Sequence, residues 1–286
     1  MGRLLRWPLA TATDRTSLVT SVLSLNVWGG RVHGPLLDYL ATTDADVVCL
    51  QEVTRTPGRG HDWLDYRDGD VVLPQRTNLF DEIAAALPGH DGLFMPAARG
   101  VLHDGDVAVP SEFGLATFWR KSLSLIGQAQ GFVHGAFLAD RWGDHPRARN
   151  AHVIRLHDHA AGFTATIAQI HGLRDPAGKE DTPARLAQAA ALAKLIRSVW
   201  PGGERLVVCG DFNVLPESRT FAVLRELGLR DLVTSRGFTD TRTSLYAKSG
   251  RFADYLLVNE RVSVTSFDVV AEPEVSDHRP LLLAFG

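Results

Sequence analysis

The stretch Arg205-Leu-Val-Val-Cys-Gly-Asp-Phe-Asn213 joins an apolar run to a polar tip, and it indicates how the chain folds. The run has the length and composition of a buried strand. Gly210 lets the backbone turn sharply where that strand ends, and Asp211 and Asn213 can then point to the same side. An Asx-type turn, in which both side chains bond their own backbone, is the alternative interpretation of this tip.

Four other polar clusters lie at the ends of apolar runs. Asn26 follows 22–25, Gln51-Glu52 follows 47–50, His171 follows 167–170, and Ser276-Asp277-His278 precedes 280–283. Each cluster alone is also typical of a turn or a solvated surface. Together, carboxylates, amides and imidazoles at several strand tips predict one site, and these groups suit a hard metal ion and phosphoester hydrolysis.

The composition describes an ordinary globular chain. Of 286 residues, 45% are apolar and 22% charged, which is enough apolar content for a sizeable core. A net charge of −3 argues against a protein held to nucleic acid by its overall field. It leaves open a nuclease with a local basic patch, for which the stretch 141–155 is a candidate; a solvated loop is the alternative.

Residues 1–17 are expected to form a short N-terminal extension, and residues 18–286 a single catalytic domain. No apolar run approaches the roughly 20 residues that span a bilayer, and Arg6 and Pro8 interrupt any signal-like segment. We therefore expect a cytoplasmic protein without a membrane span, and the sequence predicts no protein partner. Cys49 and Cys209 lie in expected buried strands, which is typical of reduced core thiols.

Apolar, β-branched runs and helix signals alternate irregularly, which favours a mixed α/β fold on one large sheet or two sheets. The expected strands are 18–25, 46–50, 113–119, 151–156, 163–170, 205–209, 253–258, 262–270 and 280–285. The expected helices are 34–42, 78–87 with Asn78 as cap, 182–200 with Thr182 as cap, and 218–228 with Ser218 as cap. The segments 53–75 and 96–112 are expected to be long irregular loops.

Asp254 and His278 are the other candidate pair. Asp254 starts an apolar run, and His278 precedes the last one. A carboxylate bonded to one ring nitrogen of His278 would fix its tautomer and leave the second nitrogen for substrate. The alternative for Asp254 is a structural charge at a strand start.

Six short motifs follow one another between residues 18 and 285, and in them the chain resembles the endonuclease/exonuclease/phosphatase superfamily. They are Leu25-Asn26-Val-Trp28, Leu50-Gln51-Glu52, Ile170-His171-Gly172, Gly210-Asp211-Phe-Asn213, Asp254-Tyr-Leu-Leu257 and Ser276-Asp277-His278-Arg-Pro280. Any one of them is weak, but six in the correct order are specific. The segment 171–185 is similar to that of an uncharacterised bacterial branch.

The resemblance implies a deoxyribonuclease I-like fold of the α/β (α+β) class. This is a four-layer αββα sandwich, in which two packed mixed β-sheets are flanked by helices and the site lies at one edge. It also implies Mg²⁺ or Mn²⁺ as cofactor. Glu52 would be the principal ligand, with Asn26 and Asp277 at or near the metal.

The same resemblance implies catalytic roles. Asp211 would orient or deprotonate the attacking water, and Asn213 would hold water or phosphate. His278, oriented by Asp254, would act as a base or stabilise the phosphorane-like oxygens. His171 would lie near the scissile phosphate and protonate the leaving group.

Some positions match the family loosely. Deoxyribonuclease I types pair a glutamate with the histidine that corresponds to His171, and Glu112 and Asp91 are candidates for that partner here. Arg149 resembles an arginine that contacts phosphate, and Arg174 is a second candidate substrate-binding residue. Apurinic endonucleases have tyrosine and asparagine where this chain has His171, which disfavours that subfamily.

The sequence therefore predicts a metal-dependent phosphoester hydrolase, with a phosphodiesterase favoured. A nuclease acting on DNA or RNA and a hydrolase of small molecules or lipid headgroups are left as alternatives. Few aromatic residues are interleaved with basic ones, unlike in a groove that binds single strands. A binding module without catalysis is a third alternative, and the intact set of catalytic residues argues against it.

Overall fold

The computed structural model describes residues 19–60 and 62–286. The expected extension at 1–17 lies outside these residues, and the domain boundary at residue 18 stays a prediction. The described strands are β1 (Thr20–Asn26), β2 (Val47–Arg55), β3 (Trp63–Asp68), β4 (Val71–Arg76), β5 (His90–Asp104), β6 (Val107–Arg120), β7 (Leu123–His134), β8 (Arg149–Asp158), β9 (Phe163–His171), β10 (Arg205–Asp211), β11 (Arg230–Asp231), β12 (Asp254–Val258), β13 (Val264–Val269) and β14 (Leu281–Phe285).

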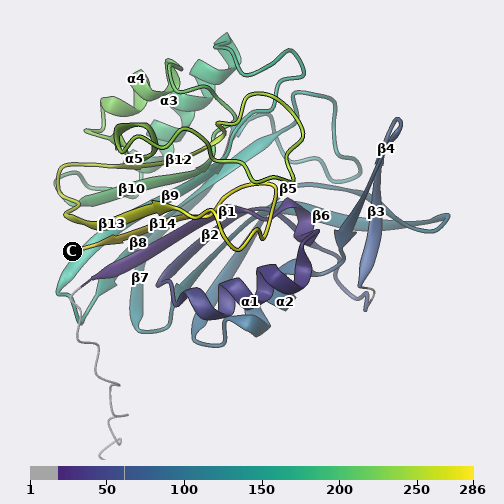
Figure 1. Ribbon diagram of the computed structural model, residues 1–286, viewed down its shortest axis with the longest axis horizontal. Helices are drawn as coiled ribbons and strands as arrows, with labels where there is room; N and C mark the ends of the chain where they lie inside the picture. Colours follow the sequence, from purple (N-terminus) through teal and green to yellow (C-terminus); the bar gives the residue numbers. More distant parts are fainter. Residues whose placement is uncertain (1–18, 61) are drawn as a thin grey trace, which may run out of the picture.

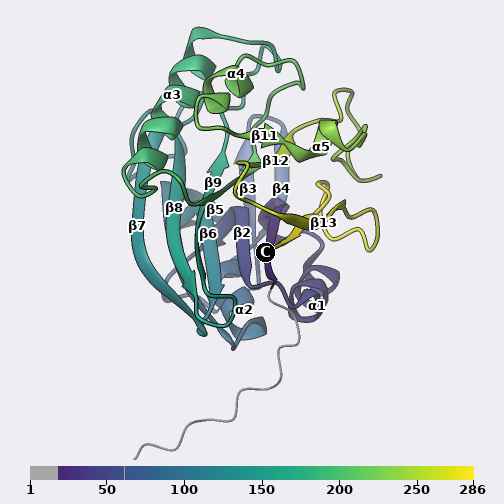
Figure 2. The same cartoon turned by 90° about the vertical axis from the view of Figure 1, so that its left-hand side faces the viewer.

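The strands form two mixed sheets that pack face to face. One has the order β13-β14-β1-β2-β6-β5-β3-β4, and the other the order β11-β12-β10-β9-β8-β7. Helices α1 (His33–Thr43) and α2 (Leu79–Ala86) cover the outer face of the first sheet. The outer face of the second is covered by α3 (Pro183–Arg197) and α4 (Thr220–Arg225), so the layers run helix, sheet, sheet, helix (Figures 1 and 2). This is the expected αββα sandwich.

Successive side chains of the central strands face the two sides of each sheet in turn, and this alternation holds the layers together. In β2, Val47 and Cys49 face the core between the sheets, whereas Val48 and Leu50 pack with the helices. Successive side chains of a strand point to opposite faces, so one short apolar run supplies two cores. Burial of both faces explains why β1, β2, β9 and β10 read as continuous apolar runs.

The helices begin close to the expected positions, but their caps differ. Thr182 accepts a hydrogen bond of 3.3 Å from the backbone N–H of Arg185, as predicted for an N-cap. Asn78 precedes α2 without capping it: its Oδ1 accepts from the N–H of Thr56, at 2.7 Å. That predicted cap was wrong because a tertiary contact uses the side chain. A short 3-10 helix, Trp28–Gly30, and helix α5 (Leu232–Ser235) complete the elements.

The two expected irregular segments are mostly strands, and this prediction was wrong. Segment 53–75 contains the end of β2, all of β3 and most of β4, and segment 96–112 contains the arms of the β5–β6 hairpin. Asp68-Gly-Asp70 and Asp104-Gly-Asp106 are turns at the tips of these hairpins. The strands escape recognition because Pro74, Pro96, Gly100 and Pro110 interrupt their short apolar runs and the alternation along them is weak. Figure 1 shows the β3–β4 hairpin projecting beside β6.

Strand β7 is absent from the expected set for a similar reason. It lies at the edge of the second sheet, and most of its residues are exposed or half-buried. An edge strand with one solvated face carries a weak apolar signal. None of the helices in the described part of the chain has the length and apolar character needed to cross a bilayer.

Candidate active site

Strand pairing brings the predicted residues to one edge of the sandwich. In the first sheet, parallel pairing aligns Asn26 with Gln51. In the second, Asp211 lies opposite His171 in β9 and opposite Asp254 in β12. Because parallel strands end at the same edge of a sheet, residues far apart in sequence meet there.

Backbone irregularities aim two of the side chains. The pairing of β2 with β6 shifts register between Leu50 and Val53, and Glu52 in that bulge has a φ of 60°. A bulge of this kind redirects a side chain out of the strand alternation. Asn213 is also left-handed, with a φ of 54°. Gly210 has a φ of 135°, and a Cβ there would lie 2.0 Å from the carbonyl oxygen of Ile170, so glycine is required.

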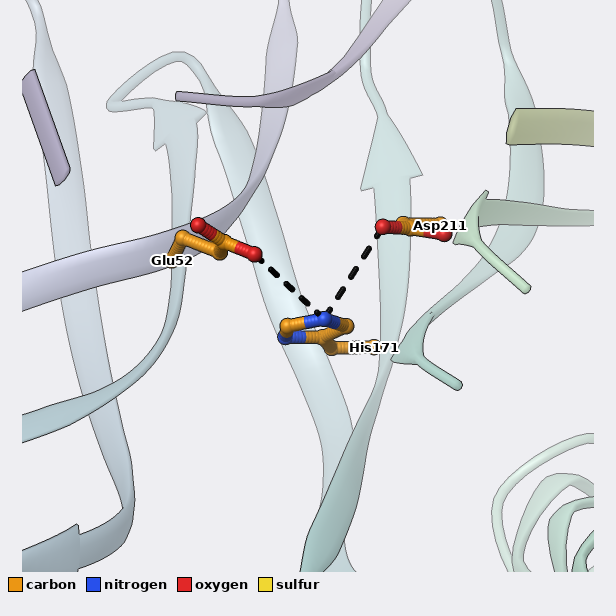
Figure 3. Close-up of side chains that lie close together, drawn as sticks. All are labelled: Glu52, His171 and Asp211. Atoms are coloured by element: carbon orange, nitrogen blue, oxygen red, sulfur yellow. Dashed lines mark ion pairs between the residues drawn. The ribbon is translucent and has the colours of Figure 1, made fainter. Parts of the chain in front are cut away.

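Glu52, His171 and Asp211 converge from both sheets. Nε2 of His171 lies 3.7 Å from Oε1 of Glu52 and 3.8 Å from Oδ2 of Asp211, and Figure 3 shows both carboxylates directed at that nitrogen. These separations exceed hydrogen-bond length. They are the separations of groups that can bind one common ligand from different sides.

Hydrogen bonds fix Asp211 in place. Nδ2 of Asn26 donates to its Oδ2 at 3.1 Å, and the backbone N–H of Asn213 donates to its Oδ1 at 3.0 Å. Asn213 also donates through Nδ2 to the carbonyl oxygen of Gly172, at 3.4 Å. The first of these bonds joins the two sheets, and the second is the local Asx geometry. The segment therefore forms the Asx-type turn and also belongs to the site.

His278 is oriented by Asp254. Its Nδ1 lies 2.8 Å and 2.9 Å from the two carboxylate oxygens of Asp254. Nη1 of Arg242 can only donate, so Nε2 of His278 accepts that hydrogen bond and the proton of the neutral ring is on Nδ1. Nε2 also lies 3.7 Å from Oδ2 of Asp211. Burial and, second, the adjacent guanidinium of Arg242 lower the pKa of His278 to about 4.

Asp277 faces the same guanidinium. Its Oδ2 accepts from Nη1 of Arg242 at 2.9 Å. Burial raises the pKa of Asp277, and it also raises the pKa of Glu52. Ser276, the preceding residue, donates a hydrogen bond of 2.6 Å to the carbonyl oxygen of Asn26, which fastens this segment to β1.

The donor set fits a divalent cation. One ligand atom from each of Glu52, His171 and Asp211 lies within 4.8 Å of the others, and the same holds for Asp211, Asp254 and His278. Burial is the main cause that raises the pKa of Glu52, and the charge of Asp211 raises it further; a bound cation would offset both effects. Carboxylate oxygens suit hard metal ions. Asn26 and Asp277, also expected at the metal, lie beside Asp211 and His278 respectively.

Glu52, His171, Asp211, Asp277 and His278 line a cavity of about 870 Å³. Arg149 lies in its wall, buried, and burial lowers the pKa of its guanidinium to about 10. Arg174 lies in the same wall and is exposed. Burial also lowers the pKa of His171 well below its usual value, with Arg149 as the next cause, so His171 is a neutral imidazole at pH 7.

Neither expected carboxylate partner of His171 pairs with it, and the site contains one residue, Arg242, that the sequence did not indicate. Among the described residues, neither Glu112 nor Asp91 forms an ion pair with His171. Asp91 lies opposite Trp119, at the far end of the sheet. Arg242, which contacts both Asp277 and His278, comes from a loop without any periodic signal, so only the tertiary structure reveals it.

Comparisons with known proteins agree with this geometry. Residues 23–278 match the family described as Endonuclease/Exonuclease/phosphatase. Over 222 residues the chain is 26% identical to the inositol phosphosphingolipids phospholipase C of Schizosaccharomyces pombe, covering 73% of this chain and 44% of that protein. The chain thus spans less than half the length of that curated relative.

Solved structures share the fold. The endonuclease/exonuclease/phosphatase from Bacteroides vulgatus matches with a TM-score of 0.66 at 19% identity, covering 94% of this chain and 98% of that one. The catalytic domain of human Nocturnin with bound sulfate matches with a TM-score of 0.63 at 19% identity, covering 94% and 93%. At these identities the likeness concerns the fold.

Proposed function

The chain belongs to the endonuclease/exonuclease/phosphatase family of phosphoester hydrolases, and from this premise we propose that it is a phosphodiesterase that depends on Mg²⁺ or Mn²⁺. The observation that carries the proposal is the convergence of Glu52, His171 and Asp211 from two sheets at the lining of one cavity. Burial also raises the pKa of Glu52 and that of Asp277, which is more typical of a functional site than of a purely structural ion pair.

Glu52 and Asp211 would hold the metal ion, with Asn26 and Asp277 beside it. When bound, such an ion neutralises charge on a phosphoryl group and lowers the pKa of water. The unfavourable burial of Glu52 is consistent with a site that is complete only when a cation binds. Hydrogen bonds fix the side chains of Asn26, Asp211 and Asp277, so these three reorganise little on binding.

Asp211 is placed to orient the attacking water. Asn26 and Asn213 each donate to one of its oxygens, and each carboxylate oxygen keeps a further lone pair as an acceptor. A carboxylate held in this way can aim a water molecule for in-line attack without losing side-chain entropy at that step. Asn213 keeps the loop beside it in the left-handed turn.

The two imidazoles have different surroundings and therefore different roles. His278 holds its proton on Nδ1 against Asp254, and its Nε2 accepts from Arg242 beside Asp211. Once Arg242 releases this nitrogen to the substrate side, His278 would assist proton removal. Nε2 of His171 faces two carboxylates, which favours a proton on that nitrogen. His171 would donate this hydrogen bond toward the leaving-group side of the phosphate.

The test uses purified protein and bis(4-nitrophenyl) phosphate as a generic diester. We expect hydrolysis with Mg²⁺ or Mn²⁺, its loss in chelator and its recovery on adding metal. Glu52→Gln removes one charge at constant size and should lower kcat by on the order of a thousandfold. Hydrolysis that persists both in chelator and in Glu52→Gln would sink the proposal.

A substrate that fits within the cavity is favoured over a long duplex. The hairpins β3–β4 and β5–β6 and the loop 242–250 contribute residues to the cavity wall, so the site shares one cavity with all three segments. The net charge of −3 also offers no broad field for nucleic acid. We therefore propose a small-molecule or headgroup phosphodiester as substrate.

A nuclease is the second candidate, because the cavity wall carries Arg147, Arg149 and Arg174. A salt titration of binding separates the two. Binding of an oligonucleotide through several phosphates should weaken steeply between low and moderate salt, with a slope near one per phosphate contact. A headgroup with one or two phosphates should show a shallow slope.

A further inference from the structure

The cavity wall beyond the candidate site is strongly cationic. Among the described residues that line the cavity, eight are lysine or arginine and five are aspartate or glutamate. Three of the five acidic residues, Glu52, Asp211 and Asp277, belong to the site itself. In a chain with a net charge of −3, this excess of positive charge around the cavity is a local feature that favours an anionic ligand.

Three arginines of this wall lie near the ends of two neighbouring strands. Strands β8 and β9 are antiparallel, and their register has Ala151 opposite Ile170. Arg149 begins β8 and Arg147 precedes it, whereas Arg174 follows the end of β9. All three line the cavity, and the charges of Arg147 and Arg174 both lower the pKa of Arg149.

Arg149 lacks a partner that its burial would normally require. The residue is 6% exposed, and its Nε is buried without a hydrogen-bond acceptor among the described residues. Buried guanidinium groups are normally paired. The charges of Glu52 and Asp211 raise the pKa of Arg149 and those of Arg147 and Arg174 lower it, so Arg149 is close to both the candidate site and the arginine pair.

Nearby carboxylates neutralise this wall only in part. Asp68 accepts a hydrogen bond of 2.9 Å from Nη2 of Arg147. Asp175 accepts instead from the backbone N–H of Ala177, at 2.9 Å. Within the described chain Arg174 forms no ion pair, so its charge is available to a ligand.

Hydrogen bonds from the buried side chain of Arg185 hold the loop that carries Arg174 in place. Arg185 is 1% exposed, and its Nη2 donates to the carbonyl oxygens of Gly178, Leu173 and Asn213 at 2.8, 3.4 and 3.3 Å. These bonds tie the loop to the segment that follows Asp211. A guanidinium on a fixed loop loses less entropy when it binds an anion.

An aromatic surface faces the same part of the cavity. The Trp142 ring packs edge-on against Tyr66 and Phe113 at centroid distances of 6.2 and 6.3 Å, and Phe113 lies 6.3 Å from the His171 ring. Such a surface contacts the carbon framework of a ligand rather than its charges. It therefore suits the part of a substrate between two anionic groups.

We propose that Arg147 and Arg174 form a subsite for a second phosphate group of the substrate, so that the preferred substrate is a phosphodiester bearing at least one further phosphate. This inference rests on the proposed function of the adjacent site. The second phosphate can belong to a nucleotide or to a polyol headgroup, since guanidinium groups recognise the phosphate in either.

The first experiment compares two substrates that differ only in the second phosphate. They are thymidine 5′-(4-nitrophenyl phosphate) and the same compound with a 3′-phosphate; release of 4-nitrophenol reports cleavage of the diester in each. We expect the full-length protein to prefer the 3′-phosphorylated compound about tenfold or more in kcat/KM. Arg174→Ala and Arg147→Ala should each reduce this ratio toward one, and Arg174→Lys should retain part of it.

The second arm uses binding, so it works without turnover. Calorimetry compares myo-inositol 1-phosphate with myo-inositol 1,4-bisphosphate, and thymidine 5′-phosphate with thymidine 3′,5′-bisphosphate, in the wild type and in Arg174→Ala. The pair with the larger gain identifies the nucleotide or polyol source. Arg236→Ala removes an exposed arginine outside the cavity and should leave every ratio unchanged.

The outcomes separate the two proposals. No gain from the second phosphate in either family of compounds overturns the subsite, and so does a gain that survives in both Arg147→Ala and Arg174→Ala. Failure of the proposed function has a different signature: neither diester is hydrolysed with Mg²⁺ or Mn²⁺, whatever the binding data show. Thermal unfolding of each variant checks that a lost gain is not a folding defect.

Discussion

Nε2 of Gln51 in β2 donates a hydrogen bond of 3.0 Å to Oε1 of Gln169 in β9, and this contact joins the two sheets immediately below Glu52 and His171. Both amides are buried. Gln169 donates in turn to the carbonyl oxygen of Ala116 at 2.8 Å and to Oγ1 of Thr117 at 2.6 Å. A polar contact inside the apolar interface thus fixes the spacing of the strand ends that carry the site.

This contact predicts a measurable coupling between the two glutamines. Gln51→Leu should destabilise the fold by about 1–3 kcal/mol, because it leaves Oε1 of Gln169 buried without a donor. The double variant Gln51→Leu/Gln169→Leu should lose less stability than the sum of the single losses, by about 0.5–3 kcal/mol. Urea unfolding of the four proteins measures this; strict additivity would show that the amides act independently.

Glu52 should bind the metal ion but lower the free energy of unfolding of the metal-free protein. Since burial raises its pKa, Glu52→Gln removes an unfavourable charge, and the variant should be as stable as the wild type or more stable in chelator. Adding Mg²⁺ or Mn²⁺ at a hundred times its Kd should stabilise the wild type by about 2.7 kcal/mol. The variant should show much less of this gain in thermal unfolding; an equal gain in both proteins would place the metal elsewhere.

Arg242 is expected to be essential to the metal-free fold. Arg242→Ala leaves Asp277 buried without its ion-pair partner, which should cost about 3–5 kcal/mol in chelator. If Asp277 faces the bound ion, part of that loss should disappear at saturating metal. The matched control is Arg155→Ala, whose ion pair with Glu204 is partly exposed and should be worth at most about 1 kcal/mol. Equal losses for Arg242→Ala in chelator and in metal would argue against Asp277 at the metal.

His152 should make the protein sensitive to mild acid. Its Nδ1 accepts from Thr117 at 2.8 Å, its Nε2 donates to Gln128 at 3.2 Å, and burial lowers its pKa to about 4. Below a pH of about 6.5, His152 therefore binds a proton in the unfolded chain but stays neutral in the folded chain. The contribution of His152 to stability is complete above that pH and is lost as the pH falls to about 4.

The corresponding experiment measures the free energy of unfolding at pH 7 and at pH 5. The drop between these values should be smaller in His152→Gln than in the wild type, by on the order of 2 kcal/mol. His159→Gln replaces an exposed histidine near the end of β8 and should keep the wild-type drop. Identical drops in all three proteins would mean that His152 takes up its proton without unfolding.

Local patterns in the sequence were enough to predict the central strands and the start of one helix. Strands β1, β2, β9 and β10 are buried on both faces, so continuous apolar runs reveal them, and the Thr182-Pro183 cap marks the start of α3. The hairpins β3–β4 and β5–β6 escaped because their strands alternate weakly and their Asp-Gly-Asp turns resemble loops. An apolar pattern indicates that residues are buried, so exposed strands leave no such pattern.

The sequence by itself determined which groups the site contains, because Asn26, Glu52, His171 and Asp211 each follow an apolar strand and the end of a strand is where a side chain leaves the core. The tertiary structure alone decided what surrounds them: the bulge that turns Glu52, the contact of Arg242 with His278, and the placing of Arg147 and Arg174 at the lining of one cavity. These depend on register and loop paths between segments far apart in the chain. No local pattern encodes them, since each is fixed only when the two sheets pack.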